Sequence, residues 1–97
     1  MQKSNPQNLE RLLSAIMCLK NKDECRSFLE DICTFQEIEA IAQRLEVACL
    51  VSSGKSYSEV NKLTGASTTT ICRVGKCLNY GTGGYKTVID RLGDDNA

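Results

Sequence analysis

Apolar residues recur every three or four positions over most of this 97-residue chain, which is the spacing of one face of an α-helix. No stretch alternates between apolar and polar residues, so the pattern predicts no β-strand. The single proline, Pro6, suits the first turn of a helix. We therefore expect an all-α fold in which short connections join six helices. Including their caps, the expected helices run over about 6–20, 21–32, 34–54, 56–65, 67–78 and 85–92.

One apolar face is expected on every helix. The first two helices are strongly apolar on one side, and this face can pack within its own domain or on a second copy of the chain. We prefer the second copy, because a chain of this length buries only a modest core by itself. Tyr80 and Tyr85 are interpreted as packing residues, with stacking on nucleic acid as the alternative. The residues expected to face inward are Leu9, Leu12, Leu13, Ile16, Met17, Cys25, Phe28, Leu29, Ile32, Ile38, Ile41, Ala42, Leu45, Ala48, Cys49, Val60, Leu63, Ile71, Val74, Leu78, Val88, Ile89 and Leu92.

Residues 56–78 have the pattern of two short helices joined by a glycine turn, a helix-turn-helix. Ser56 and Glu59 form a capping box at the start of the first helix. Gly65 supplies the left-handed backbone conformation that a sharp helix exit needs, and Ser67 can cap the second helix. A small, hydroxylated and basic outward face suits a helix that enters the major groove of DNA. That face comprises Thr68, Thr69, Thr70, Cys72, Arg73 and Lys76.

Charge is balanced over the chain but not along it. There are 12 Lys/Arg and 12 Asp/Glu, so the formal net charge is zero. Residues 1–53 hold six basic and eight acidic residues, whereas residues 54–97 hold six and four. Differences of this size also occur by chance, but this positive excess coincides with the helix-turn-helix and favours a DNA-binding surface. Lys55, Lys62 and Lys76 are candidates for phosphate contacts.

The six cysteines form no C-x-x-C pair, and the chain has no histidine, so no metal site or cofactor is expected. The chain shows no apolar signal segment and no run long enough to span a membrane. A cytoplasmic protein with reduced thiols is therefore predicted, with a redox switch at Cys72 as the alternative. No nucleophile has an activating neighbour and no glycine loop could cradle a phosphate, so no catalytic site is expected.

Several stretches resemble the Trp repressor family. Gly65-Ala66-Ser67, followed by Thr70-Ile71-Cys72-Arg73, is similar to the Gly-Ala-Gly turn and the Thr-Ile-Thr-Arg stretch of that family's reading helix. Thr34, Arg44 and Gly54 keep the family's spacing of helix cap, arginine and helix-ending glycine. The closer likeness is to the Trp-repressor-like proteins of the YerC/YecD type, and it covers about residues 9–92. The stretches that carry it are IAQRLEVA (41–48), YSEV (57–60), TGAS (64–67) and CLNYG (77–81).

The length predicts one domain over residues 1–97, with a frayed tail at 93–97. The resemblance implies that this domain is Trp repressor-like and forms an intertwined homodimer. It also implies an effector site in which Arg44 and Arg73 flank the ligand, next to Cys77 and to Thr34 of the other subunit. Two departures count against tryptophan as that effector. Val74 stands where the family has a glycine, and Cys77, a much weaker hydrogen-bonding group, replaces a serine.

These observations favour a dimeric, sequence-specific transcriptional regulator, most simply a repressor, whose partners are double-stranded DNA and a second copy of the chain. The expected DNA-binding residues are Lys55, Ser67, Thr68, Thr69, Thr70, Cys72, Arg73 and Lys76. A small-molecule effector that is not tryptophan would act between the long helix and the reading helix. The alternatives are a helical protein–protein interaction module and a cysteine-based redox-responsive regulator.

Overall fold

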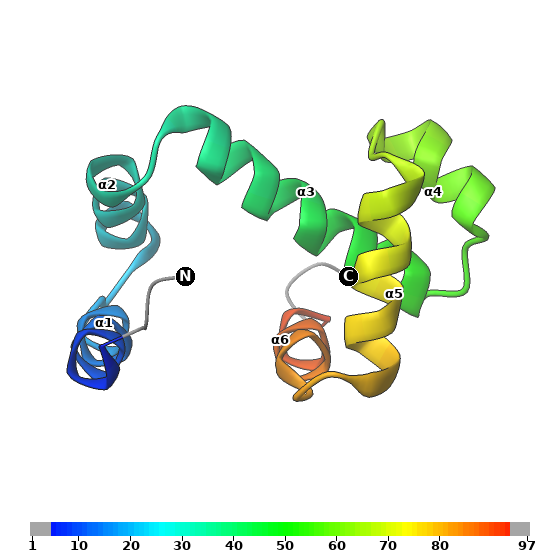
Figure 1. The fold of residues 1–97 in the computed structure, drawn as a ribbon. Coiled ribbons are helices and arrows are strands. Elements are labelled where there is room, and N and C mark those ends of the chain that lie inside the picture. Colours follow the sequence, from blue (N-terminus) through cyan, green and yellow to red (C-terminus); the bar gives the residue numbers. More distant parts are fainter. Residues whose placement is uncertain (1–4, 94–97) are drawn as a thin grey trace. The chain divides into compact units, whose positions relative to one another are not determined.

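The computed structural model describes residues 5–93, and this part of the chain is helical with no strand. The prediction of six helices is confirmed (Figure 1). The predicted frayed tail lies outside the described residues, except for Gly93, which ends the last helix. The helices are α1 (Pro6–Met17), α2 (Lys22–Ile32), α3 (Phe35–Ser52), α4 (Tyr57–Thr64), α5 (Thr68–Tyr80) and α6 (Gly84–Leu92).

Side-chain caps fix where most helices begin. The Asn21 side chain accepts a hydrogen bond from the Glu24 N–H at 2.9 Å and opens α2. Thr34 and Glu37 bond reciprocally at 3.1 and 2.8 Å at the start of α3, as their capping box predicts. The prediction for the first helix extended three residues too far, since α1 ends at Met17. The Lys20 N–H instead donates a hydrogen bond to the Glu24 carboxylate at 2.9 Å, so Lys20 belongs to the cap of α2.

The chain divides into two compact units, Met1–Ile38 and Glu39–Ala97, with the boundary inside α3. The first unit contains α1, α2 and the first turn of α3. None of its described residues is buried. The apolar stripe of α1, including Leu9, Leu13 and Ile16, is therefore exposed. Phe35, at the start of α3, is exposed as well. A single domain over residues 1–97 stays a prediction.

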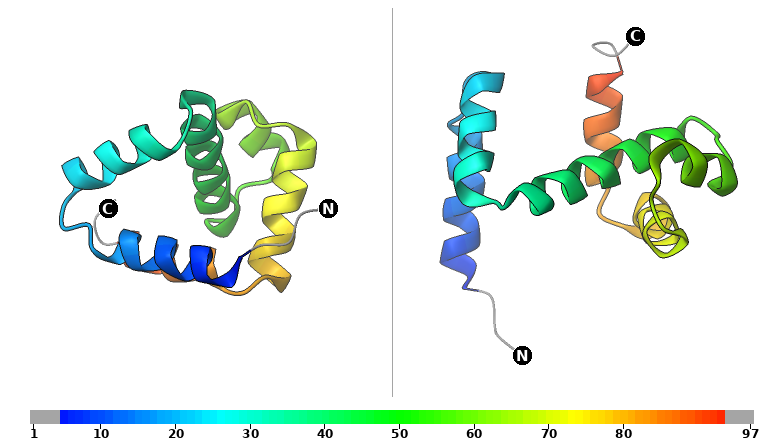
Figure 2. Two further views of the ribbon diagram at one scale, coloured as in Figure 1. Left: turned by 60° about the vertical axis from the view of Figure 1, so that its left-hand side comes forward. Right: turned by 90° about the horizontal axis from the view of Figure 1, so that it is seen from above.

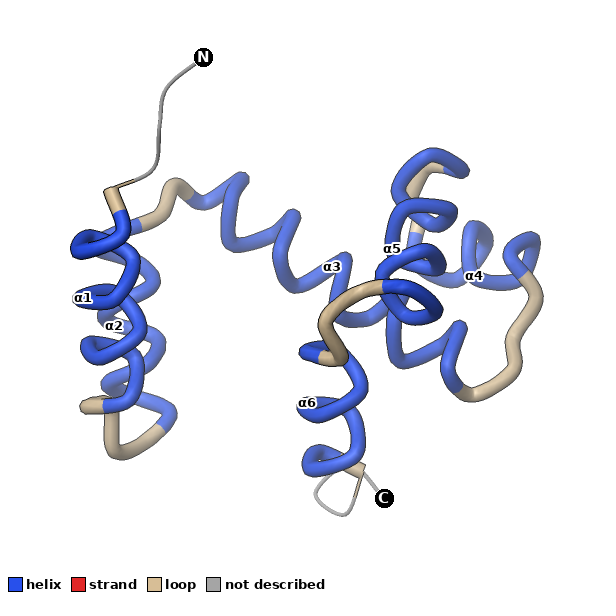
Figure 3. The backbone as a smooth tube through the Cα atoms, turned by 60° about the horizontal axis from the view of Figure 1, so that its bottom comes forward, coloured by secondary structure: helices blue, strands red, loops and turns tan. Residues whose placement is uncertain are grey.

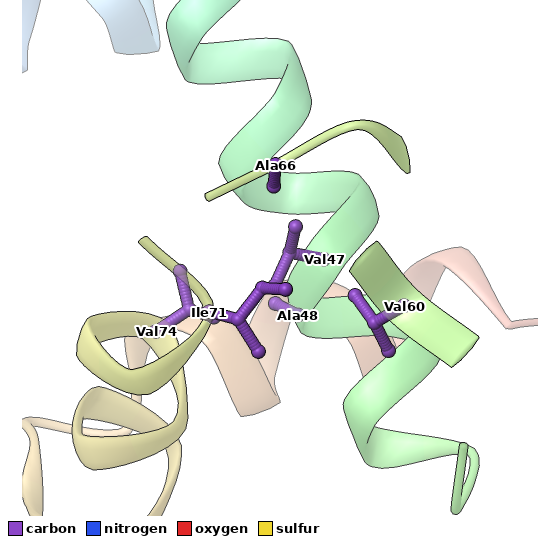
Figure 4. Close-up of a cluster of buried hydrophobic side chains, with 6 residues drawn as sticks. All are labelled: Val47, Ala48, Val60, Ala66, Ile71 and Val74. Carbon is purple, nitrogen blue, oxygen red and sulfur yellow. The ribbon is translucent and has the colours of Figure 1, made fainter. Parts of the chain in front are cut away.

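The core of the second unit lies where the C-terminal half of α3 meets α4 and α5. Figure 4 shows the six buried side chains of this cluster, contributed by α3, α4, α5 and the turn before α5. In Figures 1 and 2, α4 and α5 lie side by side, and α6 packs on α5. Leu50, Val51, Leu78, Tyr85 and Ile89 cover the edges of the core. The buried residues are Val47, Ala48, Val60, Ala66, Ile71 and Val74.

Several predictions of inward-facing residues are wrong for the chain by itself. On α3 the buried residues are Val47 and Ala48, whereas Ile41 is 48% exposed. The reason is that α4 and α5 cover only the C-terminal half of α3. Leu63 on α4 is 62% exposed, because Val60 takes the core-facing position of that short helix. The other residues that were expected inside but are exposed include the whole stripe of α1, with Leu12 and Met17. Outside α1 they are Cys25, Leu29, Ile32, Ala42 and Val88.

Short connections join the helices of the second unit, as the tube drawing in Figure 3 shows. Gly65 has φ of +74°, in the left-handed region that the sequence predicted for the end of α4. Its N–H donates to the carbonyl of Asn61 at 2.9 Å. Only Gly65, Ala66 and Ser67 then separate α4 from α5. This three-residue turn determines how α5 leaves the core.

Candidate nucleic-acid interface

The helix-turn-helix begins and ends with the caps that its sequence predicts. The Glu59 carboxylate accepts from the Ser56 N–H, and the Ser56 hydroxyl oxygen accepts from the Glu59 N–H, both at 3.2 Å. Ser67 caps α5 by accepting from the Thr70 N–H at 3.1 Å, and its hydroxyl donates to Thr70 Oγ1 at 3.1 Å. In each helix one N–H group of the first turn, which has no partner within the helix, is thus satisfied by the side chain of the cap residue.

One face of α5 is open to solvent. Ile71, Val74 and Gly75 are buried, and the opposite face of the helix projects outward. The structure therefore brings most predicted DNA-binding residues of α5 onto one exposed surface, which we call the α5 face. Thr70 is the exception, since it is half-buried and its hydroxyl bonds with Ser67. The α5 face comprises Ser67, Thr68, Thr69, Cys72, Arg73 and Lys76.

Tyr80 extends the α5 face at the C-terminal end of the helix, whereas packing was the preferred prediction for this residue and contact with nucleic acid the alternative. Its side chain is 87% exposed rather than packed, whereas Tyr85 does pack against the core. Tyr80 follows Lys76 by four residues and Arg73 by seven, so helical spacing puts the three on one side of α5. That spacing was the available signal. A tyrosine can add a hydroxyl contact or an apolar contact at the end of the surface.

Gly75 allows α4 to approach α5 closely. A Cβ atom at this buried position would overlap the hydroxyl of Tyr57, the first residue of α4. At this contact α5 contributes Gly75 and α4 contributes the ring of Tyr57. Nothing in the sequence pattern singled out this pair, because the glycine has ordinary helical geometry and lies outside the turn. The contact supports the position of the α5 face from behind.

Basic residues of the second unit also lie outside α5. Lys55 is exposed in the connection before α4, and Lys62 is exposed on α4 itself. Glu59, the acidic residue of this segment, is engaged in the capping box of α4. The carboxylate near the N-terminus of α4 also interacts favourably with the helix dipole. The basic side chains remain available to phosphates.

A hollow of about 300 Å³ opens between α3 and α5, with Arg44 and Arg73 among its lining residues. Cys77 lines it as well, so three of the four predicted effector residues share one site. Thr34 lies in the first unit, where its hydroxyl oxygen caps α3. The hollow is also lined by Thr70, Val74 and Tyr85, and no carboxylate borders it.

A second and larger hollow, of about 670 Å³, shares three lining residues with the first, Arg44, Cys77 and Tyr85. Most of its other walls are apolar. They come from Ile41 and Leu45 of α3, from Val88 of α6 and from the glycine-rich connection before α6. The exposed apolar residues of α3 and α6 thus line a common depression. This chain leaves that depression open.

All six cysteines are free thiols. Cys33 and Cys49 are half-buried, while Cys18, Cys25, Cys72 and Cys77 are exposed. In residues 5–93 no three cysteine or acidic side chains are grouped so that they could hold a metal ion. None of the helices in this range has the length and apolar character needed to cross a bilayer.

Two capped helices, a three-residue turn and an exposed hydroxylated and basic face define an all-α helix-turn-helix protein. A family model described as Trp repressor protein matches residues 7–93, so the chain belongs to the Trp repressor family, and the resemblance seen in the sequence is confirmed. Membership of this family suggests a DNA-binding regulator rather than an enzyme.

Known relatives agree with this assignment. The chain is 46% identical over 84 residues to a Bacillus subtilis (strain 168) protein named "Uncharacterized protein YerC", covering 87% of this chain and 81% of YerC. The crystal structure of a TrpR-like protein from Eubacterium eligens ATCC 27750 matches with a TM-score of 0.87 and 46% identity, and covers 92% of each chain. A solved structure from Staphylococcus aureus also gives a TM-score of 0.87, at 38% identity, and covers 92% of this chain and 89% of that one.

Proposed function

We propose that the protein is a homodimeric, sequence-specific DNA-binding repressor that reads the major groove with α5. The observation that carries this proposal is the α5 face, where hydroxyl and cationic side chains are exposed together and no acidic side chain interrupts them. Hydroxyls can bond to bases or phosphates, and an arginine can grip guanine with two hydrogen bonds. Lys55, Lys62 and Lys76 hold the register on the phosphate backbone in this proposal.

Dimer formation is supported by the apolar surface that one chain leaves uncovered. The stripe of α1, together with Leu29, Ile32 and Phe35, is exposed in the first unit. The depression lined by Ile41, Leu45 and Val88 is exposed in the second. Exposed apolar surface of this kind is typical of an interface. A twofold partner also supplies the second reading helix, so that two half-sites about one helical turn apart can be bound.

Arg73→Ala tests the DNA-binding proposal. Duplexes are first selected by the wild-type protein from a random pool at low salt. The affinity of Arg73→Ala for the selected duplex is then expected to fall about tenfold to a hundredfold, because one bidentate base or phosphate contact contributes about 1–3 kcal/mol. Gel shift or fluorescence anisotropy measures the change. Arg91→Ala, which removes an arginine from the last turn of α6, is the matched control and should bind like the wild type.

A failed selection would argue against DNA binding altogether. If no duplex is enriched at low salt, and binding shows no dependence on salt concentration, the protein is not a DNA-binding protein. A single stoichiometric protein partner in a crosslinking experiment would then favour the interaction-module alternative. Equal losses in Arg73→Ala and Arg91→Ala would show only a general dependence on positive charge.

The hollow between α3 and α5 is proposed as the effector site, for a small anion. Arg44 and Arg73 contribute two guanidinium groups, Thr70 contributes a hydroxyl, and no carboxylate neutralises them. Val74 forms part of the wall where the family glycine leaves room for a flat ring, and the Cys77 thiol bonds only weakly. Tryptophan is therefore a poor ligand for this site.

Arg44→Ala tests the effector proposal. In a thermal-shift screen of small carboxylates and inorganic phosphate, at least one anion is expected to raise the melting temperature of the wild-type protein, because a ligand that binds only the folded state stabilises it. The same anion should leave the melting temperature of Arg44→Ala unchanged, and tryptophan should change the melting temperature of neither protein. This part of the proposal is contradicted if tryptophan raises the melting temperature. It is also contradicted if none of the anions raises it.

A further inference from the structure

The turn between α4 and α5 contains a buried residue whose backbone polar groups both bond to side chains of α4. Ala66 is 1% exposed and forms part of the core of the second unit. Its carbonyl accepts a hydrogen bond from Asn61 Nδ2 at 2.7 Å. Its N–H donates to Thr64 Oγ1 at 3.0 Å. Ala66 thus has no backbone group that must find water, which a buried turn residue requires.

The hydroxyl group of Thr64 both accepts and donates a hydrogen bond. While Oγ1 accepts from Ala66, the hydroxyl donates to the Val60 carbonyl at 2.7 Å. The main chain of Thr64 is also held, since its carbonyl accepts from Gln43 Nε2 of α3 at 3.3 Å. The last turn of α4, the turn residue Ala66 and the middle of α3 are therefore linked by side-chain hydrogen bonds. The connection before α4 also has side-chain bonds, from the Ser53 hydroxyl to the Leu50 carbonyl and within the Ser56–Glu59 capping box, but its residues are exposed and Ala66 is buried.

We propose that Asn61 and Thr64 are positioning residues that set the angle at which α5 is presented to DNA, an inference that rests on the proposed function. Neither needs to touch DNA for this role. Ser67, the cap of α5, directly follows Ala66, so any rotation of Ala66 is transmitted to the first turn of the reading helix. Base recognition depends on the placement of donors and acceptors within a fraction of an ångström, whereas attraction to phosphates tolerates small shifts. Loss of the turn bonds should therefore reduce specificity more than general affinity.

Two pairs of variants test this inference. Asn61→Leu keeps the approximate shape but cannot donate to Ala66, and Ser58→Ala is a control on an exposed position of the same helix. Thr64→Val keeps the β-branched shape but loses both hydroxyl bonds, whereas Thr64→Ser retains the hydroxyl. The affinity of each variant is measured for the selected duplex and for a scrambled duplex of equal length, below the melting temperature of every variant.

The ratio of specific to non-specific affinity is the decisive quantity. It is expected to fall about tenfold or more in Asn61→Leu and Thr64→Val, with non-specific affinity changed by less than about twofold. Thr64→Ser and Ser58→Ala should keep the wild-type ratio. Unchanged ratios in both Asn61→Leu and Thr64→Val, or equal losses toward both duplexes, would overturn the inference.

A measurement without DNA separates this inference from the proposed function. Hydrogen exchange at the Thr70 and Ile71 amides, which bond to the Ser67 hydroxyl and carbonyl, reports on the first turn of α5. Both amides are expected to exchange faster in Asn61→Leu and Thr64→Val, while the Thr87 amide of α6 keeps its rate. If the wild type selects no duplex, the proposed function fails, and these exchange rates still decide whether the bonds position α5.

Discussion

Replacing Leu13 and Ile16 with lysine is expected to turn the proposed dimer into a monomer and to lower the affinity for a duplex with two half-sites about a hundredfold or more. Both residues lie on the apolar stripe of α1, which is exposed in the single chain. A leucine or isoleucine that becomes buried in an interface contributes about 1.5–3 kcal/mol, so the two together contribute a large part of a typical dimer's stability. Lysine removes this contribution and adds charges that would have to be desolvated.

The loss in DNA affinity follows from geometry rather than from any change at α5. A dimer that has bound one half-site presents its second α5 to the neighbouring half-site at a high effective concentration. A monomer binds each half-site independently and loses this advantage. The α5 face of the double variant is unaltered, so its binding to a single half-site should be close to that of one wild-type subunit.

A matched double variant on the other side of α1 controls for charge. Gln7→Lys with Ser14→Lys adds the same two positive charges to the polar face of the helix, and this protein should remain dimeric. Sedimentation equilibrium gives the mass of each protein, and anisotropy gives the affinities. A wild-type protein that is monomeric at micromolar concentration, or a Leu13→Lys/Ile16→Lys variant that remains dimeric, would show that α1 does not form the interface.

Helix boundaries were predictable because they depend on local chemistry. Asn21, Thr34, Ser56 and Ser67 each bond to an N–H group within three residues, so both partners are visible in one short stretch of sequence. The left-handed φ of Gly65 is similarly a local property. The six helices and the turn of the helix-turn-helix follow from such signals.

Which apolar residues are buried was less predictable, because burial depends on what covers them. Ile41 and Val47 are both apolar residues of α3, but only Val47 lies where α4 and α5 pack. The periodic pattern shows that a helix has an apolar face, not whether that face meets its own chain or a second copy. The exposed stripe of α1 is consistent with the sequence-based preference for a second copy.

The candidate site was predictable where it lies on one helix and not where it depends on contacts between helices. The α5 face could be read from helical spacing, although Tyr80 was assigned to packing. The bonds of Asn61 and Thr64 to the turn, and the approach of Tyr57 to Gly75, join residues that have no pattern in common. Arg44 and Arg73 line one hollow. That they lie together was predicted from the family resemblance, because nothing in the sequence around either residue indicates it.

Ile71→Ala is expected to destabilise the protein by about 2–5 kcal/mol, which is a large share of the stability of a small domain. Ile71 is 1% exposed and has the largest of the fully buried side chains. It belongs to the cluster formed by α3, α4 and α5, so the cavity left by alanine would lie directly behind the α5 face. Chemical denaturation followed by circular dichroism measures the free energy of unfolding at a fixed protein concentration.

Leu63→Ala is the informative comparison, because sequence periodicity placed Leu63 inside together with Val60. Leu63 is 62% exposed, so its truncation should change the free energy of unfolding by no more than about 0.5 kcal/mol. A loss at Leu63 as large as that at Ile71 would mean that a partner subunit covers the exposed side of α4. In that case the loss should depend on protein concentration, since dissociation of the dimer would be coupled to unfolding.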